Sequence, residues 1–126
     1  MRFLLVCLGG AVGTGARYLL GGWVQRVAGS QFPFGTLSVN VIGSFVLGLL
    51  MHVALTTDTL SPMMRLTLTT GVMGGFTTYS TFNYETVESL REGAWGLAGL
   101  NVAITVGACL AAGFLGLASG RLLVGR

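Results

Sequence analysis

Glycine and hydroxyl residues crowd the middle of the chain, where they disfavour a regular helix. The stretch reads TGVMGGFTTYSTFNYETV and contains Gly71, Gly74, Gly75, Thr77, Thr78, Ser80 and Thr81. Glycine and small hydroxyl or β-branched residues are poor helix formers, so this run predicts a broken helix. A break frees backbone carbonyl oxygens, and carbonyls at the C-terminal end of a half-helix can hold a cation without any carboxylate.

Aromatic rings and primary amides supply uncharged groups that favour an anion. Tyr79 and Phe82 are three residues apart, and their electropositive ring edges can meet an anion that has lost its water. Ordinary packing explains the same spacing. Asn40 places a strong uncharged donor in an earlier apolar stretch, and Asn101 lies nearer the start of the last one. Because burying an unpaired amide is costly, we expect Asn40 to be functional, whereas a structural role for Asn101 is equally favoured.

A single charge interrupts the first apolar stretch. Arg17 lies well inside it, and an arginine at the centre of a bilayer costs roughly 3 kcal/mol. Its side chain either extends to the membrane surface or gives a polar vestibule a positive potential that favours anions. Glu85, Glu88 and Glu92 follow the glycine–threonine run, and we interpret them as a solvated face near the membrane surface.

Composition shows that these residues belong to a membrane protein. The chain has 126 residues, of which 52% are hydrophobic and only 9% charged, and its mean hydropathy is +0.79. Soluble domains carry about 25% charged residues, so these few charges cannot cover a water-facing surface. The seven basic residues are single arginines, which indicates no nucleic-acid patch. The lone His52 forms no catalytic constellation, so the sequence predicts no enzyme.

The distribution of charges divides the chain into four apolar segments. Uncharged runs of 31, 19 and 28 residues follow Arg26, Arg65 and Glu92. Because a spanning helix needs about 20 apolar residues, we predict one all-α membrane domain over residues 1–126, with spans near 3–27, 35–57, 64–90 and 95–121. Short connections make neighbouring spans antiparallel. The third span has its midpoint at residue 77, so its break is expected at mid-membrane, buried in protein or lining a cavity.

The arginines outside the spans favour one orientation only weakly. One side carries Arg2, Arg65, Arg121 and Arg126, and the other carries Arg26 and Arg91. By the positive-inside rule this bias favours cytoplasmic termini. The bias is small enough to allow insertion in both orientations.

Three sequence motifs, taken together, are similar to a known family. G-A-R-Y in the first span, G-T-L-S-V-N in the second and G-G-F-T-T-Y-S-T-F in the third resemble the Fluc (CrcB-type) fluoride channels of microorganisms, over essentially the whole chain. The resemblance implies passive export of fluoride across the cytoplasmic (inner) membrane, which lowers fluoride toxicity. It also implies an antiparallel, dual-topology homodimer with two anion pathways and a structural sodium ion at the dimer centre.

The resemblance also implies roles for individual residues. The backbone carbonyls of Gly74 and Thr77 would bind the sodium ion. The residues implied along the fluoride pathway are Arg17, Asn40, Tyr79, Ser80, Thr81, Phe82, Asn101 and Thr105. Three positions depart from the family pattern: Tyr79 stands where phenylalanine is usual, Asn101 where tyrosine is frequent, and Cys109 where serine occurs.

Two other classes of membrane protein share the small size and four spans. A small proton-coupled multidrug exporter uses a glutamate within its first span, but here that span carries Arg17 and no acid. A non-transporting accessory subunit would explain the glycines. It would not explain hydroxyl residues gathered at a break in the third span.

Overall fold

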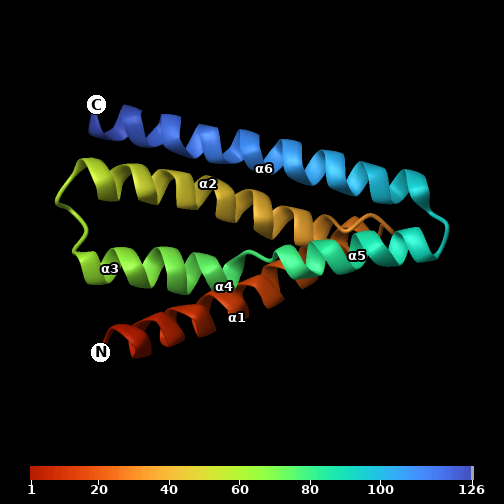
Figure 1. The fold of residues 1–126 in the computed structure, drawn as a ribbon, viewed down its shortest axis with the longest axis horizontal. Helices are drawn as coiled ribbons and strands as arrows, with labels where there is room; N and C mark the ends of the chain where they lie inside the picture. The colour runs from red at the N-terminus through yellow and green to blue at the C-terminus, as the bar shows by residue number, and fades with distance from the viewer. Residues whose placement is uncertain (126) are drawn as a thin grey trace.

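The computed structural model describes residues 1–125 as a bundle of long helices, and Arg126 lies outside this description (Figure 1). The elements are α1 (Arg2–Ala28), α2 (Phe34–Thr56), α3 (Pro62–Leu66), the π-helix η1 (Thr67–Met73), α4 (Gly74–Phe76), α5 (Tyr79–Arg91) and α6 (Trp95–Val124). The protein is therefore all-helical over the described residues.

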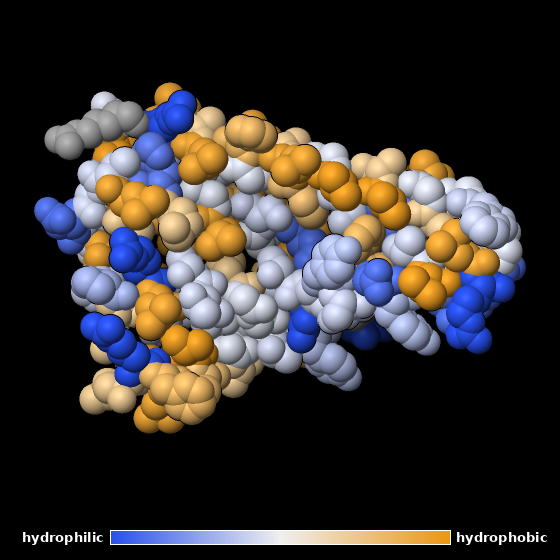
Figure 2. All heavy atoms as spheres, viewed as in Figure 1, coloured by the Kyte–Doolittle hydropathy of each residue, from blue (hydrophilic) through white to orange (hydrophobic). Residues whose placement is uncertain are grey.

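Three of the helices have the length and composition of membrane spans. α1, α2 and α6 contain 27, 23 and 30 residues and are apolar enough to cross a bilayer. Both termini lie at the same end of the bundle (Figure 1). Strongly hydrophilic residues gather mainly at the two ends of the long axis, whereas hydrophobic residues cover α6 between them (Figure 2). These features are those of a multi-pass membrane protein.

The segment from α3 to α5 runs alongside these three helices as a fourth, interrupted rod (Figure 1). Its backbone becomes extended at Thr77 (φ −87°, ψ 156°) and Thr78 (φ −151°, ψ 111°), within the run where the sequence predicts a break. The interruption separates α4 from α5, so two half-helices meet inside the bundle.

Close contact between two backbones shapes the first half of this rod. An added Cβ at Gly13 of α1 would overlap the carbonyl oxygen of Val72, and one at Gly9 would lie 2.9 Å from the carbonyl oxygen of Thr67. The seven residues that form η1 are therefore held against the glycine face of α1. The sequence analysis did not predict this π-helix, because residue patterning does not distinguish a π-turn from an α-turn.

The interior of the bundle includes buried polar side chains as well as apolar ones. Asn40, Thr78, Asn101 and Thr105 are buried, and Asn101 is only 2% exposed. Many large apolar side chains lie on the outer faces, as Phe3 of α1 and Leu122 of α6 do, although Phe76 and Phe82 are buried. So much exposed apolar surface is unlike a soluble domain, and the buried Asn40 and Thr78 place uncharged hydrogen-bonding groups at the break.

Candidate ion pathway

Asn40 holds the interruption through two hydrogen bonds. Its Oδ1 accepts the backbone N–H of Thr78 at 2.7 Å, and its Nδ2 donates to the carbonyl oxygen of Thr78 at 3.0 Å. Gly43, three residues further along α2, allows this approach, since an added Cβ would overlap the Thr77 side chain. Because Nδ2 carries two hydrogens, Asn40 keeps a second N–H beyond the one that it donates to Thr78.

The Thr78 side chain caps α5. Its Oγ1 accepts the backbone N–H of Thr81 at 3.3 Å and donates to Thr81 Oγ1 at 3.0 Å. Ser80 Oγ lies 3.4 Å from Thr78 Oγ1. Three hydroxyl groups therefore cluster at the N-terminal end of α5, where the helix dipole favours negative charge.

A groove of about 450 Å³ borders the break, where Thr77 and Thr78 line it. Asn40, Tyr79, Phe82 and Thr105 are among its lining residues, together with Cys109. The rings of Tyr79 and Phe82 meet edge to face, with centroids 5.7 Å apart. Phe82 is buried at 8% exposure and Tyr79 is open at 77%. The groove thus combines apolar walls with uncharged donors and ring edges, which suits an anion that has lost its water.

A chain of hydrogen bonds joins α6 to α5 beside this groove. Thr105 Oγ1 donates to Asn101 Oδ1 at 3.1 Å, and Asn101 Nδ2 donates to Thr86 Oγ1 at 2.9 Å. Asn101 is therefore occupied by protein partners, whereas the Thr105 side chain reaches the groove.

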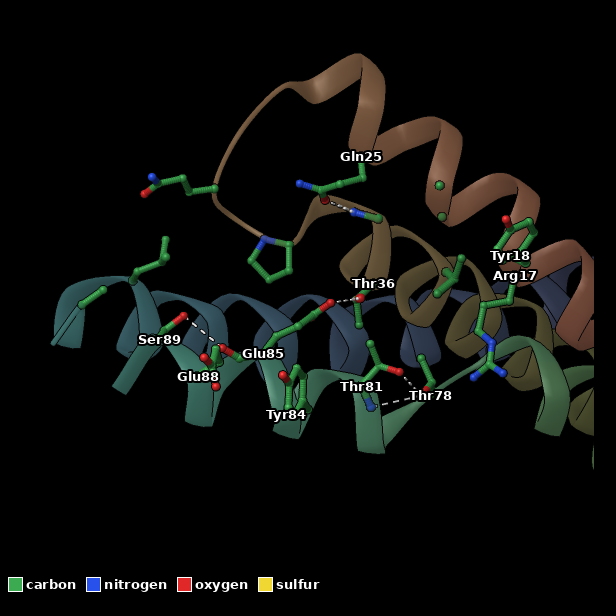
Figure 3. Close-up of a pocket in the computed structure, with 18 of the residues that line it drawn as sticks. Arg17, Tyr18, Gln25, Thr36, Thr78, Thr81, Tyr84, Glu85, Glu88 and Ser89 are labelled. Atoms are coloured by element: carbon green, nitrogen blue, oxygen red, sulfur yellow. Dashed lines mark hydrogen bonds between the residues drawn. The ribbon is translucent and has the colours of Figure 1, made fainter. Parts of the chain in front are cut away.

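A second, wider cavity of about 660 Å³ also borders the break, where Thr78 lines it (Figure 3). Arg17 enters it from α1, and Thr81 and Glu85 line it from α5. The expectation that Glu85 belongs to a solvated face is wrong. Its Oε1 accepts the Thr36 hydroxyl at 2.6 Å, and its Oε2 is buried without a hydrogen-bond partner among the described residues.

Two carbonyl oxygens at the break have lost their usual helical donors. In an α-helix the N–H of residue i donates to the carbonyl of residue i−4. The Gly74 carbonyl would therefore accept from the N–H of Thr78, and the Thr77 carbonyl would accept from the N–H of Thr81. Here these two N–H groups donate to the side chains of Asn40 and Thr78. The freed carbonyls are hard oxygen ligands of the kind that suits a small cation.

Sequence reasoning missed two parts of this arrangement. Thr78 lines both cavities, yet it was predicted only as a helix-disfavouring residue. The Thr36–Glu85 contact joins residues 49 positions apart, and no spacing pattern reports such a pair. Asn40 gave a usable signal, because a buried amide within a span requires partners.

The chain is similar to several proteins named fluoride-specific ion channel FluC. A family model described as CrcB-like protein, Camphor Resistance (CrcB), matches residues 4–117. The relative from Sorangium cellulosum is 53% identical over 123 residues, which cover 98% of this chain and 97% of the relative. A relative from Anaeromyxobacter dehalogenans is 51% identical, with 98% of both chains covered. One from Geobacter sulfurreducens is 50% identical, with 95% of this chain and 97% of the relative covered.

Proposed function

The chain belongs to the CrcB-like protein family, and from this membership and the geometry of the two cavities we propose that it is a fluoride-selective channel. In this proposal it passes fluoride passively across the cytoplasmic membrane and lowers fluoride toxicity inside the cell. It is a channel and not an enzyme. A proton-coupled multidrug exporter is not favoured, since the similar proteins carry the name of a fluoride channel.

One observation carries the proposal: the Asn40 amide, bound to the interruption, borders a groove lined by aromatic ring edges and hydroxyl groups. Fluoride is small and strongly hydrated, so a pore must replace its water by donors that do not trap it. The free N–H of Asn40 and the edges of Tyr79 and Phe82 provide such donors. All are uncharged, which favours both entry and release.

The wider cavity would act as the vestibule of this pathway. The Arg17 guanidinium supplies a positive potential there, and an anion arriving from water is attracted to it. Three acids, Glu85, Glu88 and Glu92, also line this cavity, and the first two are engaged by neighbours. Glu85 accepts from Thr36, and Glu88 forms an ion pair with Arg91 at 2.8 Å. We infer that an anion passes from Arg17 past the hydroxyl cluster of Thr78 and Thr81 into the groove.

The break would also hold a structural sodium ion through the carbonyl oxygens of Gly74 and Thr77. Both oxygens fit the role, because their helical donors are engaged elsewhere. A sodium ion bound there would supply a fixed positive charge beside the anion pathway. Gly74 is exposed on the outside of the single chain, so a second, antiparallel copy could add the same two carbonyls. We therefore propose a dual-topology homodimer with the cation at its centre.

Fluoride efflux from liposomes tests the proposed function. Vesicles loaded with potassium fluoride or potassium chloride receive the purified protein and the potassium ionophore valinomycin, and ion-selective electrodes record the released halide. We expect rapid fluoride release and chloride release close to that of protein-free vesicles. Equal release of the two halides would refute the proposal. The molar mass of the detergent-solubilised protein by light scattering tests the dimer, and a monomer mass would contradict it.

A further inference from the structure

The side chains of Asn40 and Thr78 each accept a hydrogen bond from a backbone N–H group at the break. Asn40 Oδ1 accepts the N–H of Thr78, and Thr78 Oγ1 accepts the N–H of Thr81. In a continuous α-helix these N–H groups would donate to the carbonyls of Gly74 and Thr77. Each side chain therefore competes with one carbonyl oxygen for the same hydrogen.

Burial strengthens both side-chain contacts. Asn40 and Thr78 are 8% and 7% exposed, so little water is available to compete for these hydrogens. In such surroundings an unpaired N–H is costly, and a hydrogen bond is electrostatically stronger than in water. The reciprocal bond from Asn40 Nδ2 to the Thr78 carbonyl fixes the amide orientation. If either acceptor were removed, the freed N–H would gain most by returning to the carbonyl four residues earlier.

We propose that Asn40 and Thr78 are positioning residues for the cation site, because they keep the carbonyls of Gly74 and Thr77 free to bind sodium. This inference rests on the proposed function, which includes that cation. The same two residues line the groove proposed for the anion. One pair of side chains thus maintains the cation ligands and borders the anion pathway, so a change in either residue affects both.

Measurements of sodium binding by Thr78 variants distinguish the positioning role from a general loss of structure. Radioactive ²²Na⁺ binding to the purified, detergent-solubilised protein is measured by scintillation proximity, and the midpoint of thermal unfolding is followed against Na⁺ concentration. Thr78→Val keeps the shape of the side chain and removes the acceptor. We expect sodium affinity to fall about tenfold, equal to ~1.4 kcal/mol, which is the size of a lost helix cap.

Two matched variants serve as controls. Thr78→Ser keeps the hydroxyl, so we expect sodium affinity to stay within about twofold of wild type, a difference smaller than ~0.5 kcal/mol. Thr69→Val removes another threonine hydroxyl of the same rod, one that donates to the Arg65 carbonyl at 2.8 Å, away from the break. It should leave sodium affinity unchanged.

Asn40→Leu removes the other acceptor at similar volume and should weaken sodium binding as Thr78→Val does.

The outcomes distinguish this inference from the proposed function. Unchanged sodium affinity in both Thr78→Val and Asn40→Leu would overturn the positioning role while wild-type fluoride efflux still supports the channel. If Asn40→Leu fails to fold, the Thr78 pair alone decides. An equal loss in Thr78→Ser and Thr78→Val would also overturn it, because the hydroxyl is then not the cause. Absence of sodium binding in wild type would remove the cation site and this inference with it.

Discussion

Replacing Asn40 by aspartate changes one NH2 group into a charged oxygen at the edge of the groove. The carboxylate still offers an acceptor to the Thr78 N–H, so we expect the break and the dimer to persist. It loses the donor that is 3.0 Å from the Thr78 carbonyl, and it introduces a negative charge where the anion should pass. We therefore expect fluoride flux to be abolished.

The size of the effect follows from Coulomb's law. At a distance of about 4 Å and an effective dielectric constant of about 20, two like unit charges repel by ~4 kcal/mol. At about 1.4 kcal/mol for each factor of ten, this slows anion passage by roughly a thousandfold. Such a loss of flux is much larger than the variation caused by small differences in the amount of protein incorporated into the vesicles.

Liposome efflux with a fluoride electrode measures this loss, and gel filtration verifies that the variant elutes as wild type. Asn83→Asp is the matched control. Asn83 is an exposed residue of α5, so the same change in charge is made outside both cavities. We expect its efflux to remain near wild type. Undiminished fluoride efflux in Asn40→Asp would show that Asn40 does not border the path.

Three further substitutions test other parts of the site. Arg17→Gln should lower fluoride flux most strongly at low ionic strength, because salt screens its potential; an equal loss at all salt concentrations would contradict the vestibule role. Tyr79→Phe should retain fluoride over chloride discrimination in liposomes, since the ring edge remains, whereas chloride leakage would assign the selectivity to the hydroxyl. Gly43→Ala would overlap the Thr77 side chain and should lower stability by ~1–3 kcal/mol. Thermal unfolding measures this against Gly99→Ala, which meets open space, and equal midpoints would refute the contact.

Local composition was sufficient to predict the broken rod. Glycines followed by threonines disfavour a helix whatever surrounds them, and the backbone is interrupted at Thr77 and Thr78. The long apolar runs likewise correspond to α1, α2 and α6, because the bilayer thickness sets their length.

Partners distant in sequence were not predictable in the same way. Asn40 was expected to donate to an anion, but nothing in its neighbourhood indicated that its partner would be Thr78, 38 residues later. The packing of α2 against the broken rod brings Asn40 to Thr78, and Gly43 leaves room there for the Thr77 side chain. Glu85 was misinterpreted for a related reason. Its contact with Thr36 of α2 cannot be inferred from the residues that surround Glu85 in the sequence.

Thr78 lines both the vestibule and the groove, and this shared wall has a consequence for engineering. In the proposed channel, a substitution at Thr78 that enlarges the vestibule also changes the shape of the groove, so halide capture and halide discrimination cannot be optimised by separate changes at this position. Libraries that aim at a new halide preference should therefore vary Thr78 together with residues of both compartments.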